Sequence, residues 1–303
     1  MNIFDISFKG SPDNWFNSII LKNRLTTMKT GEFNRIERSE ASTGKMPLLF
    51  LGHGSPMNAV EDNEFSSGWK DAAKYIEKPS AILCISAHWE TRGTQITAME
   101  KPRTIHDFGG FPEELYMVQY PAPGNPGLAK EIQGVLSSSE AQLDEKWGLD
   151  HGCWSVVKHM YPKADIPVLQ LSLDYYADAR RHFEIASDLG ILREKGVLII
   201  GSGNIVHNLG MVAWNRLNDD FGFDWAQEAV EKMKRFILSG NYDQLINYRT
   251  HGRAFDLAVP TPEHYLPLLY IMALRDDNEK ITFFNDKFVG GSISMTCVRI
   301  GND

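Results

Sequence analysis

The chain has 303 residues, of which 43% are hydrophobic and 23% charged, and its formal net charge is -8. These values are typical of a globular protein that can bury a sizeable core. The acidic balance argues against nucleic acid or an anionic membrane as a partner, since both need basic patches. Three cysteines, Cys84, Cys153 and Cys297, form no CxxC pair, so we expect buried, reduced thiols in a cytoplasmic protein.

The hydrophobic pattern divides the chain into an N-terminal extension and one α/β domain. Residues 1–46 lack the ordered regions of a secretory signal, and we expect a polar extension there. From 47 to 303, short apolar runs alternate with amphipathic stretches, which predicts a mixed, largely parallel sheet flanked by helices. The predicted strands cover 47–51, 80–87, 94–99, 166–173, 196–201, 280–284 and 292–300. The predicted helices cover 64–77, 126–138, 152–160, 177–195, 223–239, 241–248 and 262–274.

Three histidines stand at or soon after the carboxyl ends of predicted strands. His53 follows the first strand between two glycines, His88 ends the second, and His207 follows the strand over 196–201. Ligands of open α/β sheets bind beyond the carboxyl ends of the strands, so these imidazoles are expected at one edge. A single histidine in such a place is more often only hydrogen-bonded. The repetition favours a metal site, because imidazole is the usual ligand for zinc, iron and copper.

The segment PTPEHYLPLLYIMAL supplies two further candidate ligands. Thr261 is expected to cap a buried helix and Pro262 to occupy its first position, which puts Glu263 and His264 in the first turn. Consecutive helical residues point about 100° apart, so only one of the two is expected to face a given metal. An ionisable pair at the start of a buried helix needs a partner, and a metal would be one.

Two loops carry candidates for substrate contact. WGLDHGCW places His151 before a predicted helix, where it could donate a proton, bind a substrate or cap the helix. TIHDFGGFP is a loop whose His106 and Asp107 could form a wall facing the substrate. The chain has no dinucleotide fingerprint, no P-loop and no nucleophile elbow.

Seven motifs in order resemble the LigB-type, class III extradiol ring-cleavage dioxygenases, and among them the bacterial 4,5-DOPA dioxygenase branch. They are LGHGSPMN, SAHWETRGT, IHDFGGFP, YPAPG, DHGCW, GSGNIVHNL and TPEHYLPLLY, between about Pro47 and Ile300. The resemblance implies a single α/β domain with one non-haem Fe(II) or Zn(II) ion per chain. It also implies O2 insertion into the ring of a small, DOPA-like catechol, giving a muconic semialdehyde.

The resemblance further implies roles for individual residues. His53, His88 and His264 match metal ligands, with Glu263 as the alternative to His264. His207 matches a fourth ligand or the acid/base, and His151 lines the substrate pocket.

Two other functions remain open at this point. The first is a zinc-dependent hydrolase that uses a metal-bound water. The second is a non-catalytic, Memo-like module for metal binding or signalling. The complete set of histidine motifs, together with HDFGGFP, favours the dioxygenase.

Overall fold

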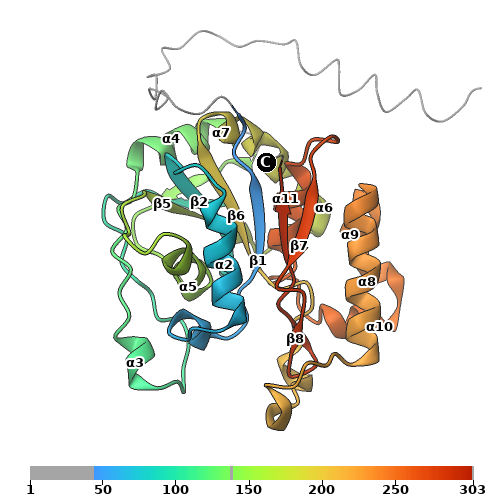
Figure 1. Cartoon of the computed structure of the whole chain (residues 1–303). Helices are drawn as coiled ribbons and strands as arrows, with labels where there is room; N and C mark the ends of the chain where they lie inside the picture. Colours follow the sequence, from blue (N-terminus) through green and yellow to red (C-terminus); the bar gives the residue numbers. More distant parts are fainter. Residues whose placement is uncertain (1–43, 137–138, 302–303) are drawn as a thin grey trace, which may run out of the picture. The chain divides into compact units, whose positions relative to one another are not determined.

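The structure is a computed structural model that describes residues 44–136 and 139–301 (Figure 1). Within these residues the centre is an eight-stranded sheet in the order β4-β3-β5-β2-β6-β1-β10-β7. Strands β5, β2, β6 and β1 are parallel, whereas β10 and β7 continue the sheet in antiparallel pairing. The predicted mixed, largely parallel sheet is therefore confirmed. The strands are β1 (Leu48–Gly52), β2 (Ala81–Thr91), β3 (Gln95–Thr97), β4 (Gln142–Asp144), β5 (Val168–Asp174), β6 (Val197–Gly203), β7 (Ile281–Phe284) and β10 (Cys297–Ile300), and a separate pair is formed by β8 (Phe288–Val289) and β9 (Ile293–Ser294).

Helices cover both faces of the sheet because successive strand residues point to opposite sides. Leu49 and Leu51 of β1 belong to the core under α2 (Glu64–Lys74) and α5 (His151–Met160). Leu48 and Phe50 belong to the core on the other side. The helices of that second core are α4 (Pro126–Val135), α6 (Ala179–Ser187), α7 (Ile191–Glu194), α8 (Asp224–Ser239), α9 (Tyr242–Ile246), α10 (Arg253–Ala258) and α11 (Leu266–Ala273).

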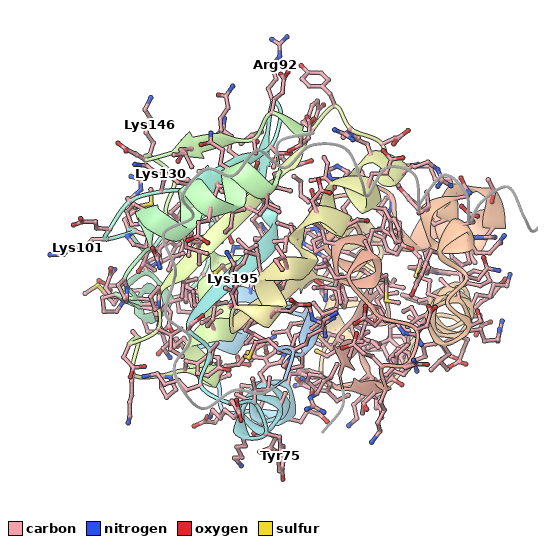
Figure 2. All side chains as sticks on the ribbon, turned by 90° about the horizontal axis from the view of Figure 1, so that it is seen from above. Tyr75, Arg92, Lys101, Lys130, Lys146 and Lys195 are labelled. Atoms are coloured by element: carbon pink, nitrogen blue, oxygen red, sulfur yellow. The ribbon has the colours of Figure 1, made fainter. Side chains whose placement is uncertain are left out.

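Charged side chains of α4 and of the loops that flank the neighbouring strands point into solvent. Figure 2 shows Arg92, Lys101, Lys130 and Lys146 extending outward from the β3, β4 and α4 side of the molecule. No helix of the described residues is long and apolar enough to cross a membrane.

Each predicted element overlaps a strand or helix of the structure, and the largest differences are at four places. The helix expected over 177–195 is divided into α6, a 3₁₀ turn over Asp188–Gly190 and α7. The strand expected over 292–300 is divided into β9 and β10, and the helix expected over 262–274 begins only at Leu266. The strand expected over 80–87 continues to Thr91. Short elements without a long apolar period were missed: β4, β8, α3 (Glu113–Tyr116) and α10.

The N-terminal extension predicted over residues 1–46 lies outside the described residues except for 44–46. Met46 is buried, its N–H donates to the carbonyl of Arg193, and its own carbonyl accepts from Arg193 Nε. The guanidinium of Arg193 also pairs with Glu279. The boundary between extension and domain stays a prediction.

The parallel register brings the carboxyl ends of three strands to one edge. Gly52 of β1 pairs with Gly203 of β6, and Ser202 of β6 pairs with Ser86 of β2. Gly203 is also where β6 meets the turn that carries His264. A Cβ at Gly203 would lie 2.1 Å from the His264 carbonyl oxygen.

Replacing Gly203 with Ala should therefore destabilise the protein by about 1–3 kcal/mol, since backbone atoms would have to move apart. Gly134→Ala is the matched control, because Gly134 lies exposed in α4 with nothing within 4 Å of its Cβ position. The free energy of unfolding of that control should increase by about 0.5–1 kcal/mol, because alanine lowers the entropy of the unfolded chain. Urea unfolding midpoints measure both, and an unchanged midpoint for Gly203→Ala would show that the contact yields easily.

Candidate metal centre

His53 is held in one orientation by a short relay of hydrogen bonds. It follows β1, is 2% exposed, and its N–H donates to the carbonyl of Gly203. The ring Nδ1 lies 3.1 Å from Ser202 Oγ, and the Ser202 hydroxyl donates its own hydrogen to the Gly152 carbonyl. Ser202 must therefore accept from His53 Nδ1–H, which leaves Nε2 with a free lone pair.

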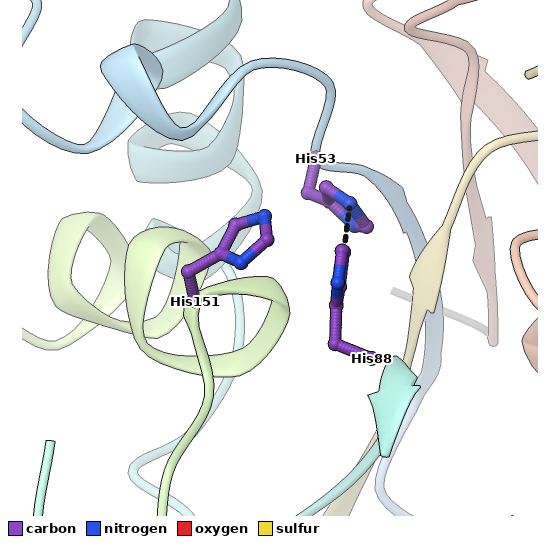
Figure 3. A group of neighbouring side chains, drawn as sticks. All are labelled: His53, His88 and His151. Carbon is purple, nitrogen blue, oxygen red and sulfur yellow. Dashed lines mark hydrogen bonds between the residues drawn. The ribbon is translucent and has the colours of Figure 1, made fainter. Parts of the chain in front are cut away.

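His88 lies in an irregular part of β2 and turns toward His53. The pairing of β2 with β5 shifts register between Ile85 and Glu90, and such irregularities re-aim side chains next to active sites. His88 Nε2 lies 3.1 Å from His53 Nε2 (Figure 3), while His88 Nδ1 lies 3.3 Å from Asp107 Oδ2. When His88 carries its hydrogen on Nδ1, facing the carboxylate, its Nε2 presents a lone pair.

The two Nε2 atoms are hydrogen-bonded when His88 carries its hydrogen on Nε2. When that hydrogen is on Nδ1, two lone pairs face each other, and a cation between the nitrogens would remove the repulsion. Two nitrogens bound to one ion at about 2.0–2.1 Å and at a right angle are about 3 Å apart. The 3.1 Å separation between His53 and His88 therefore fits a pair of metal ligands.

His264 reaches this place from a turn, so the predicted cap at Thr261 is wrong. Helix α11 begins at Leu266, and Thr261 instead donates its hydroxyl to Glu263 Oε1 at 2.8 Å. The same carboxylate oxygen lies 3.2 Å from His264 Nδ1. The His264 carbonyl accepts from Asn204 N, which ties the turn to the end of β6. The ring centroid of His264 is 5.3 Å from that of His53 and 5.0 Å from that of His88.

His207 stacks against His264. Their ring centroids are 3.5 Å apart with an interplanar angle of 8°. The backbone N–H of His207 donates to the Ala258 carbonyl, whereas no hydrogen bond from the described residues engages its ring nitrogens. The ring is thus placed by packing and keeps its nitrogens available.

The candidate ligand atoms form two adjoining groups. One ligand atom from each of His53, His88 and His151 lies within 4.8 Å of the others. The same holds for the second group, which consists of His207, Glu263 and His264. The four histidines expected as ligands are thus brought together. His53 and His88 belong to the first group, and His207 and His264 belong to the second. Which atoms hold the ion stays a prediction.

His151 is the first residue of α5 and does not cap it. Asp150 is the N-cap, and its side chain accepts from the N–H of Cys153. His151 Nδ1 lies 2.9 Å from Asp107 Oδ2, and the His151 backbone N–H donates to Asp107 Oδ1 at 2.8 Å. Asp107, expected in a wall facing the substrate, therefore contacts two histidines of the cluster.

His106 is held within its own loop. Its Nε2 donates to the Val118 carbonyl at 2.9 Å. The ring packs against Phe108, Trp154 and Tyr116. A contact between His106 and substrate stays a prediction, and packing accounts for its position.

Burial favours the neutral form of His53, His88, His207 and His264 by lowering their pKa values. Burial first, and then the neighbouring imidazoles, hold the pKa values of His53 and His264 well below the ordinary value. Burial lowers the pKa of His88 to about 3 and that of His207 to about 4. Burial alone would raise the pKa of Asp107, but hydrogen bonds and charge from His151 and the charge of His88 outweigh it and lower that pKa. Neutral imidazole is the form that binds metal ions.

A buried polar group beneath the cluster was not predicted from the sequence. Asp150 accepts from Ser86 Oγ at 2.7 Å and from Gln170 Nε2 at 2.6 Å. Ser86 Oγ in turn accepts from the N–H of His88. A Cβ at Gly152 would lie 2.8 Å from His88 Cδ2, so this glycine permits the close approach of α5 to β2. Polar residues inside otherwise apolar strands were the signal that could have indicated this group.

Comparison with known proteins identifies the class. The family profile of the catalytic LigB subunit of aromatic ring-opening dioxygenases matches residues 47–294. A protein of Escherichia coli K12 named 4,5-DOPA dioxygenase extradiol is 47% identical over 264 residues, which cover 86% of this chain and 96% of that protein. The Beta vulgaris protein of the same name is 37% identical over 261 residues, covering 81% and 93%. A crystal structure of an uncharacterized protein from Escherichia coli K12 matches with a TM-score of 0.74 at 42% identity, covering 85% of this chain and 100% of that one.

The chain therefore belongs to the LigB family of aromatic ring-opening dioxygenases. It is a metal-dependent ring-cleaving enzyme, as the motifs predicted, and the histidine cluster contains groups that could hold a metal ion. These relatives do not favour the hydrolase or the non-catalytic module.

We predict that the metal-free protein loses stability as pH falls from about 7 to about 5. The folded-state pKa values of four clustered histidines lie below their unfolded value of about 6.5. In this window the unfolded chain binds more protons, so the free energy of unfolding decreases as the pH falls. Urea titrations at several pH values measure it. The decrease should be shallower in His207→Gln, and a free energy that does not change with pH would contradict the prediction.

Proposed function

We propose that this protein is an extradiol dioxygenase that opens the ring of a small, DOPA-like catechol with O2 to give a muconic semialdehyde. The facing Nε2 atoms of His53 and His88, with His264 beside them, carry this proposal. Relatives named 4,5-DOPA dioxygenase extradiol support the substrate class.

We infer that His53, His88 and His264 hold the ion through Nε2. In each ring Nδ1 is engaged by an oxygen acceptor: Ser202, Asp107 and Glu263, respectively. Such outer hydrogen bonds fix the tautomer and orientation of metal-binding histidines. On this assignment Glu263 orients His264 and is not itself the ligand. When bound, the ion, Fe(II) or Zn(II), would supply a Lewis-acidic centre with positions open for both catechol oxygens, and Fe(II) would also supply redox activity toward O2.

His207 is the acid/base in this proposal. Its ring is neutral at neutral pH because burial lowers its pKa to about 4, and its nitrogens take no hydrogen bond from the described residues. It can therefore accept a proton from a catechol hydroxyl and return it later. A low pKa favours fast return of the proton to a product oxygen.

His151 binds the substrate in this proposal. Asp107 fixes its Nδ1–H, so its Nε2 faces the cluster as a hydrogen-bond acceptor for a substrate hydroxyl. Phe108, whose ring lies 5.5 Å from that of His151, offers an apolar surface next to this position. Together they would orient the aromatic ring of the substrate.

Location and other partners remain predictions. The three cysteines are buried free thiols, in line with a reducing compartment such as the cytoplasm. The net charge of -8 gives no reason to expect binding to nucleic acid or an anionic membrane.

The first test is catechol turnover with defined metals. We expect the Fe(II)-loaded protein to consume O2 and to form a yellow product from L-DOPA or a simple catechol. His88→Ala should abolish this activity and lose the metal, because it removes one ligand. His251→Ala is the matched control: His251 donates to the Gln244 carbonyl and lies outside the cluster. No O2 uptake by the Fe(II) form across a panel of catechols would reject the dioxygenase.

One variant can distinguish whether His207 is the acid/base or a metal ligand. His207→Gln should keep its metal, yet kcat should fall by about 10²–10⁴-fold, the range for loss of a general acid/base. Metal content by mass spectrometry and O2 uptake are measured on the same sample. Loss of the metal would instead assign His207 as a fourth ligand.

A further inference from the structure

Asp107 accepts two hydrogen bonds from His151 and lies at ion-pair distance from His88. Its Oδ1 accepts from the His151 backbone N–H at 2.8 Å. Its Oδ2 lies 2.9 Å from His151 Nδ1 and 3.3 Å from His88 Nδ1. The side chain is 16% exposed, so water does little to compete for these oxygens.

We propose that Asp107 is a positioning residue that fixes the Nδ1–H tautomer of both His88 and His151. An ionised carboxylate only accepts hydrogen bonds, so a ring nitrogen that bonds to it must carry the hydrogen. For His88 this tautomer competes with the hydrogen bond between its Nε2 and that of His53, and the negative charge of Asp107 favours the Nδ1–H form. Both rings then present unprotonated Nε2 toward the centre. One carboxylate thus sets a metal-binding ring on β2 and a pocket ring on α5 at the same time.

The chemistry requires a carboxylate and excludes an amide of the same shape. If the oxygen of an Asn amide faced the two Nδ1 atoms, its NH2 group would face the His151 backbone N–H, donor against donor. If the amide were reversed, its NH2 group would point at both Nδ1 atoms. Each ring would then have to give up its Nδ1 hydrogen and carry one on Nε2, which blocks metal binding.

The ring geometry agrees with a shared acceptor. The centroids of His88 and His151 are 3.9 Å apart at an interplanar angle of 53°. Two protonated Nδ1 atoms converge on one oxygen, and this holds the rings in contact without a direct bond between them. Asp107 therefore acts through the histidines, whereas its sequence context suggested a wall facing the substrate.

The tautomers can be measured in the metal-free protein by NMR after selective ¹⁵N labelling of histidine. Wild type should show Nδ1–H tautomers for His88 and His151. In Asp107→Asn one or both should change to Nε2–H, while His53, held by Ser202, should not change. Asp62→Asn is the matched control. The Asp62 side chain is 86% exposed, and it forms an ion pair with Lys70 away from the histidines.

Zn(II) binding to the metal-free protein gives a second measurement. Asp107→Asn should bind Zn(II) about 10–100-fold more weakly, the usual effect of losing an outer partner of a metal-binding histidine. Asp62→Asn should bind as wild type does. The expected weakening of Zn(II) binding rests on the proposed metal site, whereas the expected tautomers do not.

The outcomes separate the two proposals. An Nε2–H tautomer at His88 or His151 in wild type would overturn the role of Asp107, and that measurement needs no folded variant. Unchanged tautomers in a folded Asp107→Asn would overturn it as well. Expected tautomers without Zn(II) binding to wild type would support Asp107 and reject the proposed metal site.

Discussion

The site depends on the register of three parallel strands. Because Leu51, Ser86 and Ser202 are paired neighbours in β1, β2 and β6, the residues that follow them emerge at one edge of the sheet. Both faces of the sheet are buried, so a slip of one residue would exchange the side chains that pack on the two faces, and packing against two different cores fixes the register. The fold thereby determines where the histidines stand before any of them makes a polar contact.

Oxygen acceptors behind the histidines orient their rings. Ser202, Asp107 and Glu263 engage Nδ1 of His53, His88 and His264. Burial lowers the pKa values of these rings, so each is neutral and offers one ring nitrogen with a lone pair. A cation between the Nε2 atoms of His53 and His88 would take the place of the hydrogen that can join these atoms at 3.1 Å.

The site residues were predictable to different degrees. His53, His88 and His207 could be found because strand ends are visible in the hydrophobic pattern, and ligands bind at strand ends. The start of α11 could not, because Thr261 and Pro262 match the composition of a cap while forming a turn that ends at Tyr265. Local residue preference is a weak predictor of the backbone over 261–265. A contact distant in sequence, the hydrogen bond from Asn204 N–H to the His264 carbonyl, holds this segment as a turn.

The sequence by itself determined the α/β class, the order of the main strands and helices, and the set of histidines near the site. These follow from hydrophobic periodicity and from motifs that are contiguous along the chain. Only the tertiary structure decided which ring nitrogen faces inward, that Asp150 caps α5, and that Asp107 joins His88 to His151. Such contacts join residues from separate elements, and their geometry depends on packing distances that no local pattern encodes.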